Sequence, residues 1–218
     1  MRFVSGLVAL VAAVSTGAAA VHAEGNRYGY PRDYHSDISP VAAYLAMQRA
    51  DGTVMIDVRS VGEFAGGHAP QSYNIPYPRI AGANKDDPAY RAMSDADFLA
   101  EVERRFPDRA TPIITMCQSG GRSALAANIL AKAGYANVRS VWTGYLGRPL
   151  TDTNGAAVDA NANGIIAGVT PGPDGGAPLA DPGDMDGWAG FHQLPVSRAI
   201  DPERVLPALR ALYPAAPE

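Results

Sequence analysis

The first two thirds of the chain alternate short apolar runs, rich in β-branched residues, with segments whose apolar residues recur at helical spacing. Such runs predict strands, here at residues 53–58, 74–76, 112–116 and 138–142. The segments between them predict a helical turn at residues 63–64 and helices at residues 40–50, 94–106 and 123–132. Strands that alternate with helices form a parallel sheet with helices on both faces, so we expect an α/β fold.

Polar residues indicate where the helices begin. Ser39 before Pro40 predicts a helix N-terminus, and Ser94 resembles the first residue of a capping box. Asp201-Pro202 predicts the start of a closing helix. The apolar face of that helix consists of Val205, Leu206, Leu209 and Leu212.

The alternating pattern ends near Arg148. Between Arg148 and Arg198 the chain has no Lys or Arg, six Asp and many Gly and Pro. We interpret this stretch as an irregular acidic insertion, longer than compact domains usually carry without a function. The predicted parts of the chain are a signal peptide (1–23), a polar lead (24–35), a catalytic domain (36–147), the acidic insertion (148–186) and a C-terminal anchor with the closing helix (187–218).

The N-terminal segment has the three regions of a secretory signal peptide. Arg2 supplies a positive charge, an uncharged stretch follows, and small residues precede Ala23. We expect cleavage after Ala23, with Ala20 as the alternative site. A retained membrane anchor is a further alternative, but the stretch is rich in Ala, Gly and Ser and only weakly apolar. The interpretation predicts an exported, periplasmic protein with no membrane contact after cleavage.

Composition argues against a nucleic-acid partner and rules out an internal disulfide. The 218 residues have a formal net charge of −4, and their Lys and Arg are scattered, which argues against a nucleic-acid partner. The single cysteine, Cys117, cannot form an internal disulfide. A lone cysteine in an exported protein is either buried and inert or reactive, and its neighbours decide between the two.

The neighbours of Cys117 favour a reactive thiolate. Cys117 directly follows a predicted strand, so it lies at the carboxyl edge of the sheet, where parallel sheets bind their ligands. Gly120 and Gly121 allow the positive φ angles that a tight curl needs before the next helix. Such a curl directs backbone N–H groups to one point beside a helix N-terminus, and Arg122 adds a positive charge. This site suits an anionic sulfur.

The loop also resembles a known family. The sequence CQSGGRS at residues 117–123 is similar to the active loop of rhodanese (thiosulfate sulfurtransferase) domains. Residues 56–59, 63–64 and 67–68 resemble the first signature of that family, and residues 74–76 follow at the right distance. The resemblance covers roughly residues 36–147. It implies a rhodanese-like three-layer fold with a five-stranded parallel sheet.

The resemblance also implies a mechanism and a set of roles. Cys117 would take a sulfane sulfur from a donor such as thiosulfate, hold it as a persulfide and pass it to a thiol, to cyanide or to a protein acceptor. Arg122 would help to stabilise the anionic sulfur, and no cofactor is required. The loop residues that would bind substrate are Gln118, Ser119, Gly120, Gly121 and Ser123. The supporting residues are Asp57, Arg59 and Glu63, as an ion-pair network, and His68, as a hydrogen-bonded loop residue.

One departure from the family pattern and two alternative functions bear on this interpretation. Gln118 stands where many thiosulfate-using members have a basic residue, so the donor stays open. A non-catalytic sulfur carrier or partner-binding module, docked through the acidic insertion, is the alternative from another class. A phosphatase or arsenate reductase is the enzymatic alternative. The six residues from Cys117 to Arg122 argue against it, because phosphatase loops have seven.

The later part of the chain carries two further patterns. Residues 187–195 resemble the Gly-Trp…Leu-Pro ending of some single-domain bacterial rhodaneses, so we expect Trp188 to fold back onto the core. Inside the insertion, oxygen ligands alternate as in the first half of a Ca²⁺ loop, at Asp159, Asn161, Asn163 and the backbone of Ile165. The usual bidentate Glu is absent, and Asp152, Asp174 or Asp181 would have to replace it. A structural Ca²⁺ site and a solvated turn are the two hypotheses.

Overall fold

The computed structural model describes residues 31–214. The predicted signal peptide and its cleavage site lie outside the described residues, as do most of the predicted lead and the last four residues. None of the helices between residues 31 and 214 is long and apolar enough to cross a membrane.

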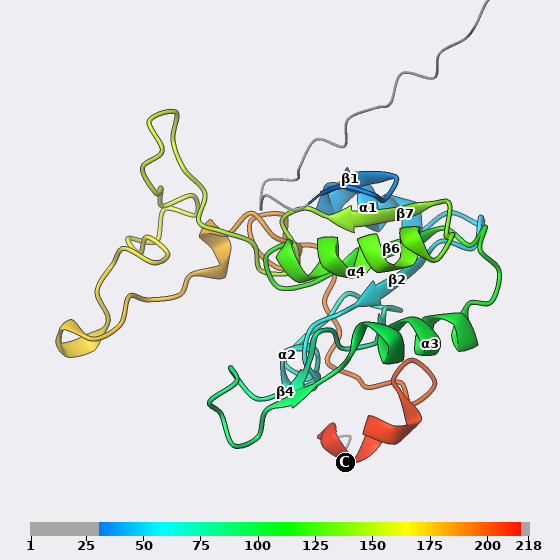
Figure 1. Ribbon diagram of the computed structural model, residues 1–218. Coiled ribbons are helices and arrows are strands. Elements are labelled where there is room, and N and C mark those ends of the chain that lie inside the picture. The colour runs from blue at the N-terminus through cyan, green and yellow to red at the C-terminus, as the bar shows by residue number, and fades with distance from the viewer. Residues whose placement is uncertain (1–30, 215–218) are drawn as a thin grey trace, which may run out of the picture.

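The centre of the molecule is a five-stranded parallel sheet in the order β1-β7-β6-β2-β3 (Figure 1). The strands are β1 (Ser36–Ile38), β2 (Val54–Asp57), β3 (Tyr73–Asn74), β6 (Ile113–Met116) and β7 (Val138–Val141). The predicted α/β fold with a five-stranded parallel sheet is therefore confirmed. The four strands expected from the apolar runs lie where the sequence places them, whereas β1 was not expected.

Helices cover both faces of this sheet. They are α1 (Pro40–Met47), α2 (Val61–Ala65), α3 (Asp95–Arg105) and α4 (Gly121–Lys132). Met55 packs on the α1 face, whereas its neighbour Ile56 packs on the face of α3 and α4, because successive strand residues point to opposite sides. Ser39 and Ser94 cap α1 and α3 as predicted, each accepting a hydrogen bond from a backbone N–H of the first turn.

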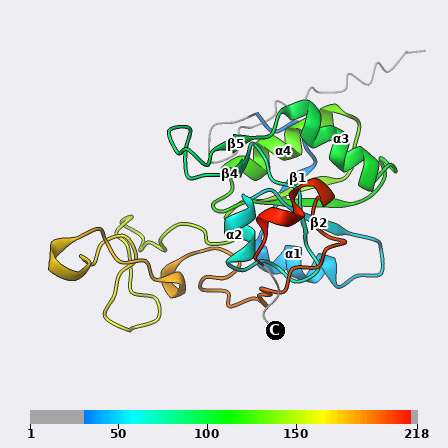
Figure 2. The same cartoon turned by 90° about the horizontal axis from the view of Figure 1, so that it is seen from below.

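Two predictions about local structure were wrong. The segment after residue 201 is no α-helix but a turn followed by a 3-10 helix, Pro207–Leu212, because Pro207 lacks an N–H and keeps Leu206 extended. Figure 2 shows this segment beside α2, where the rings of Tyr213 and Phe64 meet edge to face. For residues 77–88 the sequence pattern predicts a loop, but Arg79–Ala81 form strand β4, which pairs with β5 (Arg91–Ala92) in an antiparallel hairpin.

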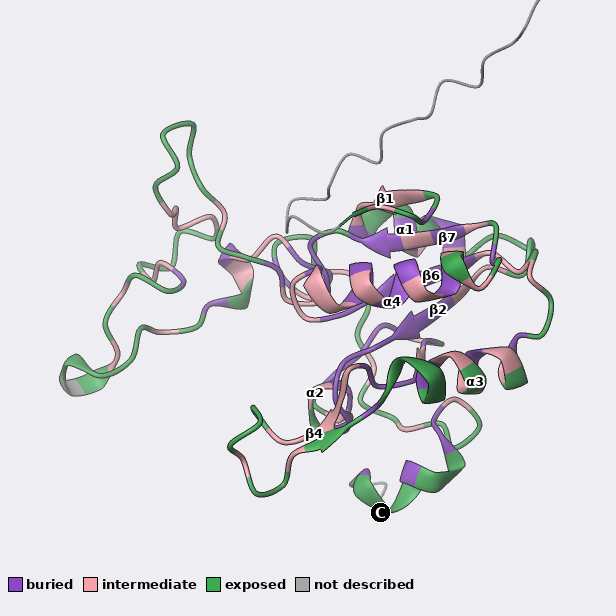
Figure 3. Ribbon diagram, viewed as in Figure 1, coloured by how far each residue is buried: buried purple, intermediate pink, exposed green. Residues whose placement is uncertain are grey.

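Residues 148–186, which we call the arm, project from the sheet and return to it (Figures 1 and 3). The arm contains two short 3-10 helices, Pro173–Gly175 and Pro182–Asp184. A bridge joins Pro149 to Met185, so the two ends of the arm lie side by side, and a second bridge joins Thr151 to Ala157 near its start. Directly after the arm, Trp188 is fully buried against the α1 face.

Candidate active site

Cys117 is the first residue after β6, and the chain reverses around its sulfur. The Sγ atom accepts a hydrogen bond from the backbone N–H of Gly120 at 3.1 Å. Gly120 has a φ of 103°, a left-handed conformation that favours glycine, and α4 begins at the next residue. Gly121 is already helical, so only one of the two glycines needs the positive φ expected of both. The sulfur thus faces a backbone donor at the N-terminus of α4.

Backbone hydrogen bonds from the segment that follows β7 hold this loop in place. The N–H of Tyr145 donates to the carbonyl of Cys117 at 2.7 Å, and those of Leu146 and Gly147 donate to the carbonyl of Gln118 at 3.0 Å. The chain that returns from the arm then bonds to the same segment, since the Gly187 N–H donates to the Leu146 carbonyl at 3.0 Å. The base of the arm is therefore two hydrogen bonds away from the cysteine loop.

The predicted loop residues differ in burial and in hydrogen bonding. Ser123 is fully buried, and its hydroxyl donates to the Gly120 carbonyl at 2.8 Å, so it stabilises the loop from inside the fold. The side chain of Gln118 is half-buried. Its Oε1 atom has no hydrogen-bond partner within the described part of the chain. Ser119 is half-buried as well.

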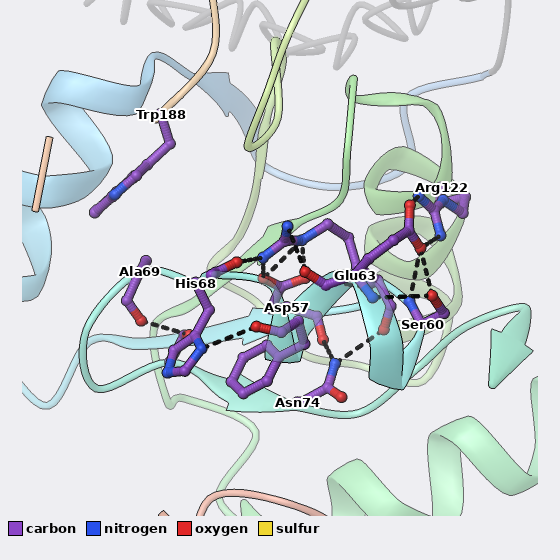
Figure 4. A network of polar contacts seen from close by, with 12 residues as sticks. Asp57, Ser60, Glu63, His68, Ala69, Asn74, Arg122 and Trp188 are labelled. Carbon is purple, nitrogen blue, oxygen red and sulfur yellow. Dashed lines mark hydrogen bonds and ion pairs between the residues drawn. The ribbon is translucent and has the colours of Figure 1, made fainter. Parts of the chain in front are cut away.

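Arg122 and Glu63 form a two-point ion pair beside the loop. The Nη1 and Nη2 atoms of Arg122 lie 2.8 and 2.7 Å from the two carboxylate oxygens of Glu63 (Figure 4). Burial raises the pKa of Glu63, but the hydrogen bonds and charge of Arg122, together with Ser60, outweigh it and hold that pKa far below its usual range. Glu63 therefore remains ionised at any physiological pH.

Asp57 and Arg59 form a second, deeper ion pair. Arg59 is 1 % exposed and Asp57 is fully buried, and their closest atoms are 2.7 Å apart. The remaining Arg59 donors reach the carbonyls of Glu63 and Gly67, and the guanidinium lies 3.7 Å from the ring centre of Tyr145. The predicted network of Asp57, Arg59 and Glu63 therefore consists of two ion pairs, joined through the Glu63 backbone.

His68 lies on the other side of this network from Arg122 (Figure 4). Its ring stacks on Phe64 with centres 3.8 Å apart, and its Nδ1 lies 3.1 Å from the Phe64 carbonyl. Burial lowers the pKa of His68, which favours the neutral ring. The imidazole is thus packed and hydrogen-bonded inside the fold.

Three residues of the site were given no individual role by the sequence. Arg79, the first residue of β4, lies 3.0 Å from Glu63. Asn74 donates to the carbonyls of Asp57 and Arg59, and Tyr145 covers the Arg59 guanidinium. Because each acts through a long-range contact, its role in the site does not follow from the local sequence pattern.

The residues of the predicted Ca²⁺ loop come together in the arm. The carboxylate of Asp159 accepts hydrogen bonds from the N–H groups of Asn163 and Gly164. Asp181, one of the three acids considered as a replacement for the missing Glu, contacts the side-chain amides of Asn161 and Asn163. Within residues 31–214, no group of three or more His, Cys, Asp or Glu side chains is arranged to hold a metal ion. The Ca²⁺ hypothesis stays a prediction.

Comparison with known proteins identifies the family. The sequence-family model of the rhodanese-like domain matches residues 41–147. The Arabidopsis thaliana protein named thiosulfate sulfurtransferase 16, chloroplastic, is 38 % identical over 90 residues, which are 41 % of this chain and 68 % of that protein. This chain belongs to the rhodanese family.

Two further similar proteins cover different shares of the chain. The Saccharomyces cerevisiae thiosulfate:glutathione sulfurtransferase is 31 % identical over 84 residues, 38 % of this chain and 55 % of its own length. The crystal structure of Rv0390 from Mycobacterium tuberculosis aligns with 76 % of this chain and 99 % of its own, with 24 % identity and a TM-score of 0.47. This rhodanese chain spans about half to two thirds of the length of the curated relatives it matches.

Proposed function

We propose that this protein is a sulfurtransferase that carries a sulfane sulfur as a persulfide on Cys117. The observation that carries the proposal is the position of Sγ at the carboxyl end of β6, 3.1 Å from the Gly120 N–H and in front of α4. An anionic sulfur there gains from the backbone donor and from the positive end of the helix dipole. The names of the relatives support the same type of reaction.

The proposed reaction has two displacement steps. The Cys117 thiolate attacks the sulfane sulfur of thiosulfate, an S–S bond forms to Sγ, and sulfite leaves with the electron pair of the broken S–S bond. A thiolate or cyanide then attacks the terminal sulfur, and the electron pair returns to Sγ. Charge and atoms balance in both steps, so neither an oxidant nor a reductant is consumed. An ionised Cys117 needs no general base.

Burial of Cys117 favours small donors. The residue is 1 % exposed, so the donor must present its sulfur at the end of a narrow group. In the persulfide, the terminal sulfur extends about 2 Å beyond Sγ, which is the length of an S–S bond. The acceptor therefore attacks an atom that lies one S–S bond beyond Sγ.

The intact mass of the purified protein after incubation with thiosulfate tests the proposal. We expect a gain equal to one sulfur atom in the wild-type protein and none in Cys117→Ala. Ser60→Ala is a matched control, since Ser60 contacts Glu63 but not the sulfur, and it should still gain sulfur. If no sulfane donor adds sulfur to the wild-type protein, the proposal is wrong.

Turnover distinguishes the enzyme from a sulfur carrier. With thiosulfate and cyanide in excess, the enzyme produces many equivalents of thiocyanate per Cys117. A non-catalytic carrier gives a stoichiometric persulfide and no further product. Steady-state thiocyanate release therefore separates the two functions.

A further inference from the structure

Two arginines share the carboxylate of Glu63. Arg122 binds both oxygens, and Arg79 binds Oε2 at 3.0 Å from the hairpin side. The Ser60 N–H and hydroxyl also donate to Oε2, at 2.9 and 2.7 Å. The side chains of Arg79, Glu63 and Arg122 keep about a fifth to a quarter of their area exposed, so solutes can sense their charge.

The net charge of this cluster decides how strongly it attracts an anion. Arg122 paired with Glu63 alone is a neutral unit beside the cysteine loop. Arg79 makes the cluster net positive by one charge. Glu63, Arg79 and Asp87 line a solvent-open hollow of about 570 Å³ between α2 and the β4–β5 hairpin. The Asp87 carboxylate is half-buried and accepts hydrogen bonds from the Ala83 and Ala89 N–H groups, which offset part of its negative charge.

We propose that Arg79 is a positioning residue that sets the donor specificity of the sulfur transfer. By sharing Glu63, it leaves part of the Arg122 charge free to act on an anion at the cysteine loop. The Cys117 loop itself offers no other cation, since position 118 is Gln. Arg79 therefore favours a dianionic donor such as thiosulfate over a donor of lower charge. This inference rests on the proposed function.

Steady-state kinetics with two donors of different charge test this role. Thiosulfate is a dianion, and an organic thiosulfonate such as methanethiosulfonate is a monoanionic donor of the same sulfane sulfur. Because the interaction energy of two charges is proportional to each of them, Arg79→Gln should raise KM about fivefold for thiosulfate and about twofold for methanethiosulfonate. We expect kcat to change little and Arg79→Lys to restore most of the thiosulfate KM.

A matched variant controls for the loss of charge on the hairpin. Arg91→Gln removes the same charge from the exposed strand β5, which pairs with β4, and its KM values should stay at wild-type level. The inference is overturned if Arg79→Gln behaves like Arg91→Gln. It is equally overturned if Arg79→Gln lowers kcat or raises both KM values by the same factor, which indicates a structural role. If the wild-type protein turns over neither donor and gains no sulfur, the proposed function fails as well.

Discussion

The sheet domain and the arm are stabilised by different interactions. In residues 36–147, strands and helices bury two apolar clusters, one on each face of the sheet. In the arm, the only buried side chains among those described are Ala167, Asp181 and Asp184. The Asp184 carboxylate accepts hydrogen bonds from the N–H groups of Ala160 and Ala167, and its own backbone carbonyl accepts one from Leu150. Carboxylates thus replace apolar side chains as the centre of the arm.

This difference separates global stability from local order. Apolar burial couples every element of the sheet domain, so the loss of one large side chain weakens the whole domain. Hydrogen bonds to a carboxylate order only the segments that donate them. Substitutions in the two regions should therefore differ in how far their effects reach.

The largest effect is expected at the junction of the two regions. Trp188 is fully buried in the α1-face cluster, and its Nε1 donates to the Pro195 carbonyl at 2.8 Å. Trp188→Ala should lower the free energy of unfolding by about 3–5 kcal/mol, measured by urea denaturation, because it opens a cavity. Phe191, three residues later, is 52 % exposed, so Phe191→Ala should cost less than about 0.5 kcal/mol. Equal losses would show that Trp188 does not anchor the chain.

The next effect lies within the arm. Asp184→Ala removes both hydrogen bonds to its carboxylate, and we expect a local loss of about 1–3 kcal/mol. Amide hydrogen exchange should become faster at Ala160 and Ala167, while the urea midpoint of the sheet domain stays unchanged. Asp152→Ala, at an exposed position of the arm, should leave those two amides protected. A drop in the global midpoint would contradict the separation of the two regions.

The parts of the fold that are coded locally could be predicted from the sequence. The apolar runs identify β2, β6 and β7, the hydroxyls of Ser39 and Ser94 identify helix starts, and the glycines after Cys117 identify the loop. β1 has only three residues with Asp37 at its centre, and its hydrogen bonds to β7 define it. Nothing in so short a polar run distinguishes it from a turn.

The candidate site shows the same division. Cys117 and its loop follow from adjacent residues, but the partner of Glu63 does not. The sequence grouped Glu63 with Asp57 and Arg59, whereas the fold brings Arg122 and Arg79 to its carboxylate. Ser123 was expected to line the loop, but it is the second hydroxyl of the buried chain from Ser140 to Gly120. Such pairings depend on how the elements pack in three dimensions.

A smaller effect should appear as a pH dependence of the sheet domain. The pKa of His68 in the fold is lowered by burial from 6.5, the value for an unburied ring. As the pH falls below about 6.5, the unfolded chain binds a proton that the folded protein resists, so the free energy of unfolding falls. The loss is limited to about 1.4 kcal/mol per pH unit. Urea denaturation between pH 7.5 and 5.5 should show this slope, and His68→Gln should flatten it.

An exposed histidine controls for general effects of pH. His35 lies at the surface, so His35→Gln should keep the wild-type slope. If His68→Gln and the wild-type protein lose stability in parallel, the burial of His68 is not the cause.

The smallest effect concerns the Ca²⁺ prediction for the arm. Asp159 and Asp181 bring two carboxylates to the amides of Asn161 and Asn163, without a third acid side chain. So few charges predict a millimolar site at best, and 1 mM Ca²⁺ would then add about 0.4 kcal/mol to the local stability of the arm. Amide exchange at residues 159–166 should slow with Ca²⁺ but not with Mg²⁺, and Asp159→Ala should abolish the difference. If the exchange rates do not change with Ca²⁺, the solvated turn is the correct interpretation. The hydrogen bonds between Asp181 and the side-chain amides of Asn161 and Asn163 then satisfy these groups without an ion.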